Sequence, residues 1–301
     1  MIKTSIIEGT NKLGMTAIFL AIIGWSSAGI FIKLLPNIDA IFIVAIRLSI
    51  SLFVTLILLL LLKKNFTKYI KHLFEIKTWA FGLILFFCYF LGTLAFQIAP
   101  VGEVTILMTL SPLFIIIFNL ILGYGVKKIE IIGVIIALFG IVFITFEQMS
   151  YQDNSLSNRL LGNIFALIVS ILFAVYALLY NTFDKKDKSP NIISVTLSTF
   201  IIGTILLIVL ITINTETDIT FQNNINILFL IGIAVIATAI PTISYSIASK
   251  QLKPIVTTSL LLLEPFIAIL LAFLIISEIP SLFIVPGLIF ILIGLLLIMK
   301  R

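Results

Sequence analysis

The stretch SLLLLEPFIAILLAF, residues 259–273, decides the fold class because it places Glu264 and Pro265 inside an otherwise apolar run. A charge and a helix breaker are both unfavourable within an apolar helix, so the surroundings of the run need an explanation. Hydrophobic residues make up 61% of the 301 residues and charged residues only 11%, with a mean hydropathy of +1.30. Soluble domains are about 45–50% apolar and about 25% charged. The sequence therefore predicts an integral membrane protein surrounded by lipid.

Long uninterrupted apolar runs predict helices rather than barrel strands. A helix satisfies its backbone hydrogen bonds within one segment, and about 20 apolar residues span a bilayer. Barrel strands would instead alternate apolar and polar residues over about ten positions. We predict an all-α integral membrane fold with ten transmembrane helices, near residues 13–34, 38–62, 76–98, 102–124, 128–146, 160–180, 191–213, 226–249, 254–277 and 281–300.

The basic residues predict the orientation of these helices. If the N-terminus is cytoplasmic, 16 of the 19 Lys and Arg residues fall in cytoplasmic segments. The outer segments hold only Arg159, while Lys33 and Arg47 lie within spans. This distribution follows the positive-inside rule and accounts for the net charge of +6 without a nucleic-acid partner. We therefore expect both termini in the cytoplasm. The Ile-, Asn- and Lys-rich composition points to a bacterial plasma (inner) membrane.

A weak internal repeat divides the chain into two halves. The recurrences, at offsets of 153 or 154 residues, are Pro36-Asn37-Ile38 with Pro190-Asn191-Ile192, Ser111-Pro112 with Glu264-Pro265, and Gly133 and Gly140 with Gly287 and Gly294. They predict a duplication, with one five-helix repeat in residues 1–150 and a second in residues 151–301. Because five is odd, the second repeat would enter the membrane inverted, which is an architecture typical of secondary transporters.

The sequence also resembles the EamA-type ten-helix members of the drug/metabolite transporter superfamily, over nearly its whole length. The residues that carry the resemblance are Gly24-Trp25-Ser26, Arg47, Leu252-Lys253-Pro254, Leu263-Glu264-Pro265, Ser277-Glu278, and Gly287 with Gly294. Where the family usually has a Glu after its fourth span, this chain has Gly123-Tyr124. The resemblance implies a secondary transporter that moves a small organic metabolite by alternating access. It also implies export as the commonest direction, and we expect an amino acid, amine or related compound.

Two ionisable residues within the spans are candidates for a substrate-binding or coupling site. Glu264 follows Pro254 by ten residues, about 15 Å along a helix, and a charge at such a depth costs about 2.5–3.5 kcal/mol. Glu264 is either a substrate-facing or proton-coupling acid, or a structural acid that pairs with Arg47 or with backbone loosened by Pro265. Arg47 could bind a substrate carboxylate, or it could pair with Glu264 or Glu103.

Aromatic residues form a second group of candidates. Trp25 and Tyr89 fall midway through predicted spans, away from the interfaces where aromatic belts lie. A cavity lined by Trp25, Tyr89, Tyr176 and Tyr245, with Ser26 next to Trp25 and one acid nearby, would suit an amine or zwitterion through cation–π contacts. Ordinary packing, with each polar tip bonded across a helix interface, is the alternative.

Three prolines are predicted to bend spans, namely Pro112, Pro241 and Pro265. Each removes a backbone donor and clashes with the carbonyl four residues earlier. Paired bends near the middle of the membrane could let helix halves open and close two vestibules. The alternative is that these prolines are simply tolerated, because neighbouring helices satisfy the loosened backbone groups.

The sequence argues against catalytic, metal and cofactor chemistry. Cys88 and His72 are the only residues of their types, so cysteine clusters and most histidine-based sites are excluded. A G-x-x-x-x-G-K-[ST] nucleotide loop is absent from the sequence, so coupling would come from protons, exchange or the solute gradient. We expect a small-molecule substrate and the lipid bilayer as partners, and the sequence leaves the oligomeric state open. An integral-membrane enzyme, or a channel or scaffold without carrier activity, are the alternative functions.

Overall fold

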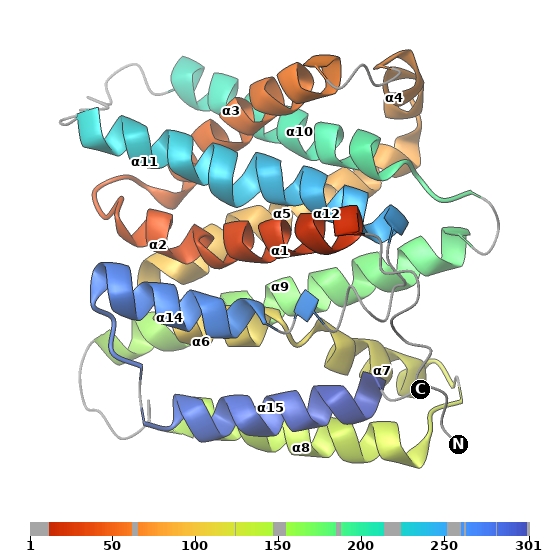
Figure 1. Ribbon diagram of the computed structural model, residues 1–301, viewed down its shortest axis with the longest axis vertical. Helices are drawn as coiled ribbons and strands as arrows, with labels where there is room; N and C mark the ends of the chain where they lie inside the picture. The colour runs from red at the N-terminus through yellow and green to blue at the C-terminus, as the bar shows by residue number, and fades with distance from the viewer. Residues whose placement is uncertain are drawn as a thin grey trace.

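The computed structural model describes residues 12–61, 66–123, 125–146, 155–184, 188–213, 224–251, 260–261, 263–280 and 282–299. Within these residues all regular secondary structure is helical, and Figure 1 shows the helices lying side by side across the view. In lipid, the backbone has no water to bond with, and a helix satisfies its own N–H and C=O groups. The predicted all-α fold is therefore confirmed.

The helices of the first half are α1 (Lys12–Ser26), α2 (Ala28–Lys33), α3 (Ala40–Leu61), α4 (Phe66–Leu73), α5 (Ile76–Ile98), α6 (Val101–Met108), α7 (Ser111–Ile121) and α8 (Lys128–Phe146). Those of the second half are α9 (Ser155–Asp184), α10 (Ile192–Ile213), α11 (Asn224–Ala234), a π-helical segment (Val235–Ala239), α12 (Ile240–Gln251), α14 (Glu264–Ile276) and α15 (Ile284–Met299). Two of the apolar runs are each divided into two helices. One helix ends and the next begins between α1 and α2, and the same happens between α6 and α7.

Seven helical stretches among the described residues are long and apolar enough to cross a bilayer, namely Lys12–Lys33, Ala40–Leu61, Ile76–Ile98, Val101–Ile121, Ser157–Tyr180, Ile192–Ile213 and Asn226–Tyr245. They coincide with the first four predicted spans and with the sixth to the eighth. Helix α8 covers the predicted fifth span, and two shorter apolar helices, Glu264–Ile276 and Ile284–Leu297, fall within the ninth and tenth. Residues 254–259 of the predicted ninth span lie outside the described residues. The total of ten crossings stays a prediction.

The helices associate in pairs that join the two halves of the chain. Helix α1 packs against α12, α5 against α9, α3 against α10, and α8 against α15, and α6 also contacts α14. The pair α8 and α15 forms the lower edge of the bundle in Figure 1. Its close approach depends on glycines, because a Cβ on Gly140 would lie 2.6 Å from the Gly287 carbonyl oxygen and one on Gly294 would lie 2.5 Å from that of Gly133. Small residues at such contacts are typical of membrane helix packing.

The distribution of polar and apolar side chains is that of a membrane protein. Large apolar side chains such as Phe53, Leu60 and Leu274 are exposed on the outward helix faces, each by more than half of its surface. Charged side chains such as Arg47 and Glu103, and hydroxyl side chains such as Thr238, are buried within the bundle instead. Lipid-facing surfaces need apolar groups, while polar groups need internal partners. The fold therefore gathers its polar chemistry in the interior.

The two Xaa-Pro motifs of the internal repeat take the same local structure. Helix α7 begins at Ser111 with Pro112 in its first turn, and α14 begins at Glu264 with Pro265 in its first turn. The residue before each helix donates its N–H to the carbonyl three residues earlier, at 3.3 Å for Leu110 and 3.0 Å for Leu263. Proline is well tolerated at a helix start because its missing N–H would have no partner there. Each proline therefore begins a new helix after an interruption.

Candidate functional site

The π-helical segment Val235–Ala239 forms next to Pro241. Proline has no N–H to give to the carbonyl four residues back, and just before it the Ile240 N–H bonds the Val235 carbonyl, five residues back. The Thr238 hydroxyl, buried in this segment, donates to the Ile233 carbonyl at 2.8 Å. Single π-helical turns often occur at functional sites. Pro241 therefore accompanies a local widening of the helix that carries a buried hydroxyl.

Arg47, on α3, lies against this widened turn. Its side chain is only 3% exposed. Nε and Nη2 donate to the Thr238 hydroxyl at 3.1 and 2.7 Å, and Nη1 donates to the Thr93 hydroxyl on α5 at 3.3 Å. The guanidinium also lies 4.9 Å from the centre of the Tyr89 ring, within the range of a cation–π contact.

The prediction that Arg47 forms an ion pair with Glu264 or Glu103 is wrong. No carboxylate of the described residues lies within ion-pair distance of Arg47. Glu103, in the first turn of α6, is instead bound by Arg159, and Glu264 lies at the start of α14. Three neutral groups from α5 and the π-helical segment surround the guanidinium in place of an acid.

The aromatic candidates of the sequence continue this cluster. The Tyr89 hydroxyl lies 3.2 Å from the Thr242 hydroxyl, which donates to the Thr238 carbonyl at 2.6 Å. Trp25, on α1, is a neighbour of Tyr89, and its ring lies 5.3 Å from that of Tyr245 on α12. Helices α1, α3, α5 and α12 thus bring Trp25, Arg47, Tyr89 and Tyr245 into one continuous group.

Tyr176, on α9, belongs mainly to a different aromatic group. Its ring makes an edge contact with Phe81 at 5.1 Å and stacks on Tyr180 at 6.1 Å. These rings fill the interface of α5 with α9. The immediate contacts of Tyr176 are therefore packing contacts, although Tyr245 also lies in its neighbourhood.

Glu264 meets the same part of α1 through its backbone. The Ser26 hydroxyl donates to the Glu264 carbonyl oxygen at 3.0 Å. Glu264 is partly buried, and its carboxylate makes no hydrogen bond or ion pair with the residues that the structure describes. It opens α14, where a negative charge is favoured by the helix dipole. Segment Gly24-Trp25-Ser26 thus contacts α12, the aromatic cluster and Glu264 in turn.

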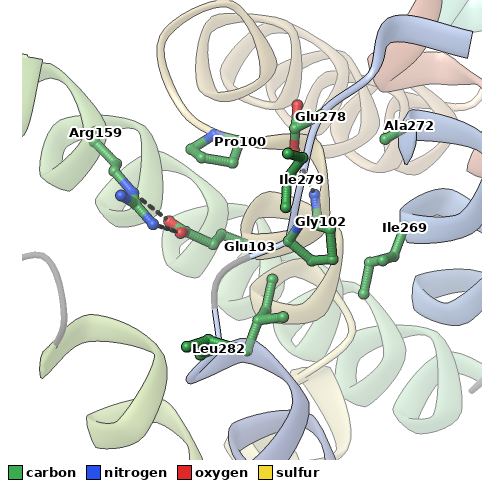
Figure 2. Close-up of a pocket in the computed structure, with 11 residues that line it drawn as sticks. Pro100, Gly102, Glu103, Arg159, Ile269, Ala272, Glu278, Ile279 and Leu282 are labelled. Carbon is green, nitrogen blue, oxygen red and sulfur yellow. Dashed lines mark hydrogen bonds and ion pairs between the residues drawn. The ribbon is translucent and has the colours of Figure 1, made fainter. Parts of the chain in front are cut away.

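A second polar group, which the sequence did not predict, lies where α6 and α9 begin. The Glu103 side chain is 2% exposed, and its carboxylate forms an ion pair with Arg159. Arg159 Nε donates to it at 3.1 Å and the Asn163 amide at 2.9 Å. Two features of the sequence could have indicated this pair. Arg159 is the sole basic residue of the predicted outer segments, and Glu103 is an acid at the start of an apolar run. Figure 2 shows this pair beside a cavity of about 400 Å³.

Glu278, just beyond the end of α14, lies on the same cavity. Its carboxylate accepts a hydrogen bond from the Gly102 N–H at 3.5 Å, so it caps the N-terminus of α6. Burial raises the pKa of Glu278, although Lys33 and the backbone N–H groups of Gly102 and Val101 oppose part of that rise. Lys33 itself donates to the Gln97 carbonyl at 3.4 Å. These contacts tie α2, α5, α6 and α14 together at one end of the bundle.

The described residues contain no group of three or more His, Cys, Asp or Glu side chains that could hold a metal ion. The polar groups of the cluster around Arg47 and Ser26 are one buried cation, one carboxylate at the start of α14, hydroxyl groups and aromatic rings. Such groups can bind and orient a small polar molecule.

Comparison with known proteins agrees with this arrangement of apolar helices. The EamA-like transporter family matches residues 12–146 and, a second time, residues 160–300. The chain belongs to this family. It is a membrane protein with two EamA repeats, and members of the family are transporters rather than enzymes.

Two further comparisons found a related sequence and a similar fold. An "uncharacterized transporter" of Clostridium kluyveri is 26% identical over 174 residues, which are 58% of this chain and 55% of that protein. The chain therefore matches about half the length of this curated relative. A solved crystal structure is similar over 95% of this chain and 96% of its own, with a TM-score of 0.64 and 17% identity. At that identity the likeness concerns the fold alone.

Proposed function

We propose that this protein is a secondary carrier that moves a small organic metabolite across the membrane by alternating access. The observation that carries the proposal is the polar cluster of Arg47, Tyr89, Trp25 and Tyr245 within an apolar bundle, with Glu264 held against the adjacent Ser26. An ionisable group within the membrane is a functional candidate by default, because its burial is costly. Membership of the EamA-like transporter family supports transport rather than catalysis.

The architecture supports alternating access. Helices α1 and α9, the first of each half, run in opposite directions across the bundle in Figure 1, as two inverted repeats of five spans require. The helix pairings also relate the two halves. At the offset of the internal repeat, α9 corresponds to α1 and α12 corresponds to α5, and α1 packs on α12 just as α9 packs on α5. In carriers built from inverted repeats, the substrate lies near the midplane between the repeats, often beside interrupted helices. The starts of α7 and α14 at Pro112 and Pro265 supply such interruptions.

The substrate class, direction and location form part of the same proposal. A cation, a carboxylate and aromatic faces suit an amino acid, an amine or a related compound, and export is the expected direction. The membrane is the bacterial inner membrane with both termini in the cytoplasm, in keeping with the positive-inside rule. Helix α1 begins and α15 ends at the same end of the bundle, on the right in Figure 1, which agrees with an even number of crossings.

Counterflow in proteoliposomes tests this function. Vesicles preloaded with an unlabelled amino acid or amine should accumulate the labelled compound from outside faster than empty vesicles, because a carrier exchanges its substrates. A channel would show no such trans-stimulation, and an enzyme would release a chemically changed product. Absence of exchange across amino acids, amines, polyamines, nucleotides and quaternary amines would overturn the proposal.

A further inference from the structure

Arg47 is a buried cation that the described protein residues do not neutralise. Its side chain is 3% exposed on a helix that is long and apolar enough to span the bilayer. An arginine stays protonated in proteins, and a charge at the centre of a membrane helix costs about 2.5–3.5 kcal/mol. Buried charges are therefore normally paired with an opposite charge. Within the described part of the chain, no acid performs that role.

The hydroxyl groups around Arg47 hold it in place without compensating its charge. The Thr238 hydroxyl gives its proton to the Ile233 carbonyl at 2.8 Å and accepts from Nε and Nη2. The Thr93 hydroxyl gives its proton to the Tyr89 carbonyl at 2.8 Å and accepts from Nη1. Each threonine is thus oriented by a backbone carbonyl and presents a lone pair to the guanidinium. The arrangement fixes the position of a full positive charge.

Arg47 retains donors for one more partner. A guanidinium has five N–H groups, and the hydrogen bonds to described residues use one on each of its three nitrogens. One N–H on each terminal nitrogen remains. A carboxylate binds arginine through two parallel N–H···O bonds, which are short and strong because both partners are charged.

Glu103, another buried charged residue, has an oppositely charged partner within the described residues. Glu103 is 1% exposed, and it is matched by a guanidinium from Arg159 and an amide from Asn163. Arg47 is buried to a similar degree, yet it has only hydroxyls and the Tyr89 ring around it. If Arg47 had only a structural role, we would expect an acidic partner for it, as Glu103 has a basic one.

We propose that Arg47 binds a carboxylate group of the transported molecule, so that the substrates of this carrier are carboxylate-bearing metabolites. The inference rests on the proposed carrier function and narrows its substrate class. It favours amino acids over simple amines, polyamines and quaternary amines.

The test compares matched compounds on the wild-type protein. For each amino acid that exchanges in counterflow, the inhibition constant is measured for the acid, for its C-terminal amide and for the amine that lacks the carboxyl group. We expect the amide and the amine to inhibit at least about tenfold more weakly, the factor that 1.4 kcal/mol represents. The corresponding carboxylic acid without the amino group should keep measurable inhibition.

Failure of this inference differs from failure of the proposed function. If amines and amides exchange as well as amino acids do, Arg47 does not select a carboxylate, while the carrier function stands. If no compound of any class exchanges, the carrier function itself is wrong. A thermal shift caused by chloride alone, which carboxylates do not change, would also overturn the inference because an inorganic anion would then be the partner.

Variants locate the effect at Arg47. Arg47→Gln should remove the preference for the acid over its amide, and Arg47→Lys should weaken carboxylate binding because an ammonium lacks the planar fork. Lys77→Gln removes one positive charge from the start of α5, far along that helix from Thr93, and is the matched control. Retention of the full preference in Arg47→Gln would contradict the proposal. If Arg47→Gln fails to fold, the wild-type compound series and Arg47→Lys decide the question.

Discussion

The guanidinium of Arg159, in the second turn of α9, forms an ion pair with the carboxylate of Glu103 in the first turn of α6. The two side chains differ in environment, because Glu103 is 2% exposed and Arg159 is 25% exposed. Asn163, one turn further along α9, adds a hydrogen bond to the same carboxylate. The pair therefore joins the two halves of the chain through one deeply buried charge and one that reaches the surface.

This asymmetry predicts which partner is more costly to remove. Arg159→Gln leaves a buried carboxylate without its guanidinium and should lower the free energy of unfolding by up to about 3–5 kcal/mol. Glu103→Gln leaves a cation that can reach water and should cost only about 1 kcal/mol. The double variant should be more stable than Arg159→Gln alone. Unfolding in mixed micelles measures all three, and a larger loss for Glu103→Gln would contradict the assignment of the buried partner.

Glu264→Gln is predicted to separate transport from stability. The carboxylate has no partner among the described residues, so an amide in its place removes an unfavourable charge and should leave the protein monodisperse and at least as stable. Transport should be abolished or uncoupled, with a fall of at least about tenfold in initial rate. Glu75→Gln, which removes an acid before the start of α5, is the control for lost charge in the transport assay, where it should keep wild-type uptake in spite of its lower stability. Wild-type uptake by Glu264→Gln would make Glu264 a structural residue.

The helices could be predicted closely from the sequence. The predicted span 76–98 is α5, Ile76–Ile98, and the predicted span 191–213 is α10, Ile192–Ile213, within one residue. Lipid explains this success, since an apolar run long enough to span has only the helix as a way to satisfy its backbone. The interruptions were less predictable. Pro241 indicated a bend, but the π-helical turn before it depends on how neighbouring side chains take up the loosened carbonyls.

The site could be predicted by residue type and not by partner. Trp25 and Tyr89 were chosen for their depth, and Tyr245 and Tyr176 as further rings lining the same cavity. The structure brings Trp25, Tyr89 and Tyr245 together, whereas Tyr176 packs mainly against Phe81 and Tyr180. The partners of Arg47 were wrong because periodicity reveals a helix face only when polar and apolar residues alternate around it. Helix α3 is apolar on nearly every side, so its sequence does not show that Arg47 turns toward Thr93 and Thr238 rather than toward an acid.

The pH dependence of stability should change in a defined direction when Glu278 is replaced. Burial raises the pKa of its carboxyl above the ordinary value of 4.5, so the folded state holds this proton more tightly than the unfolded state. The resulting stabilisation is present below pH 4.5 and is lost as the pH rises through the raised pKa. Relative to wild type, Glu278→Gln should therefore gain stability as the pH is raised toward neutrality.

Glu75 supplies the control of opposite sign. Hydrogen bonds from Lys77 and His72 lower the pKa of its carboxyl below 4.5, so its stabilising contribution is present above that value and is lost as the pH falls through the lowered pKa. Glu75→Gln should lose stability relative to wild type near neutrality and converge with it in acid. Thermal unfolding of both variants between about pH 4 and pH 8 measures the two trends, and trends of the same sign would contradict this account.

Gly24→Ala should destabilise the junction of α1 with the π-helical segment. A Cβ at this position would overlap Pro241 and would lie 2.5 Å from the Ile236 carbonyl oxygen. Neither the proline ring nor the backbone can move aside cheaply, so overpacking of this kind should cost about 1–3 kcal/mol. Because Ile236 lies in the same turn as Thr238, the displacement should also weaken the binding of substrates at Arg47.

Gly92→Ala is the matched control within another membrane helix. The nearest atoms to a Cβ added at Gly92 on α5 belong to the Met108 side chain, whose methyl group would lie at 3.1 Å, and a methionine side chain can rearrange at little cost. Alanine also favours helix over glycine by about 1 kcal/mol, so this variant should be neutral or slightly stabilised. Thermal unfolding in detergent compares the two variants directly. Equal effects would show that the contact of Gly24 with Pro241 does not constrain the packing of α1.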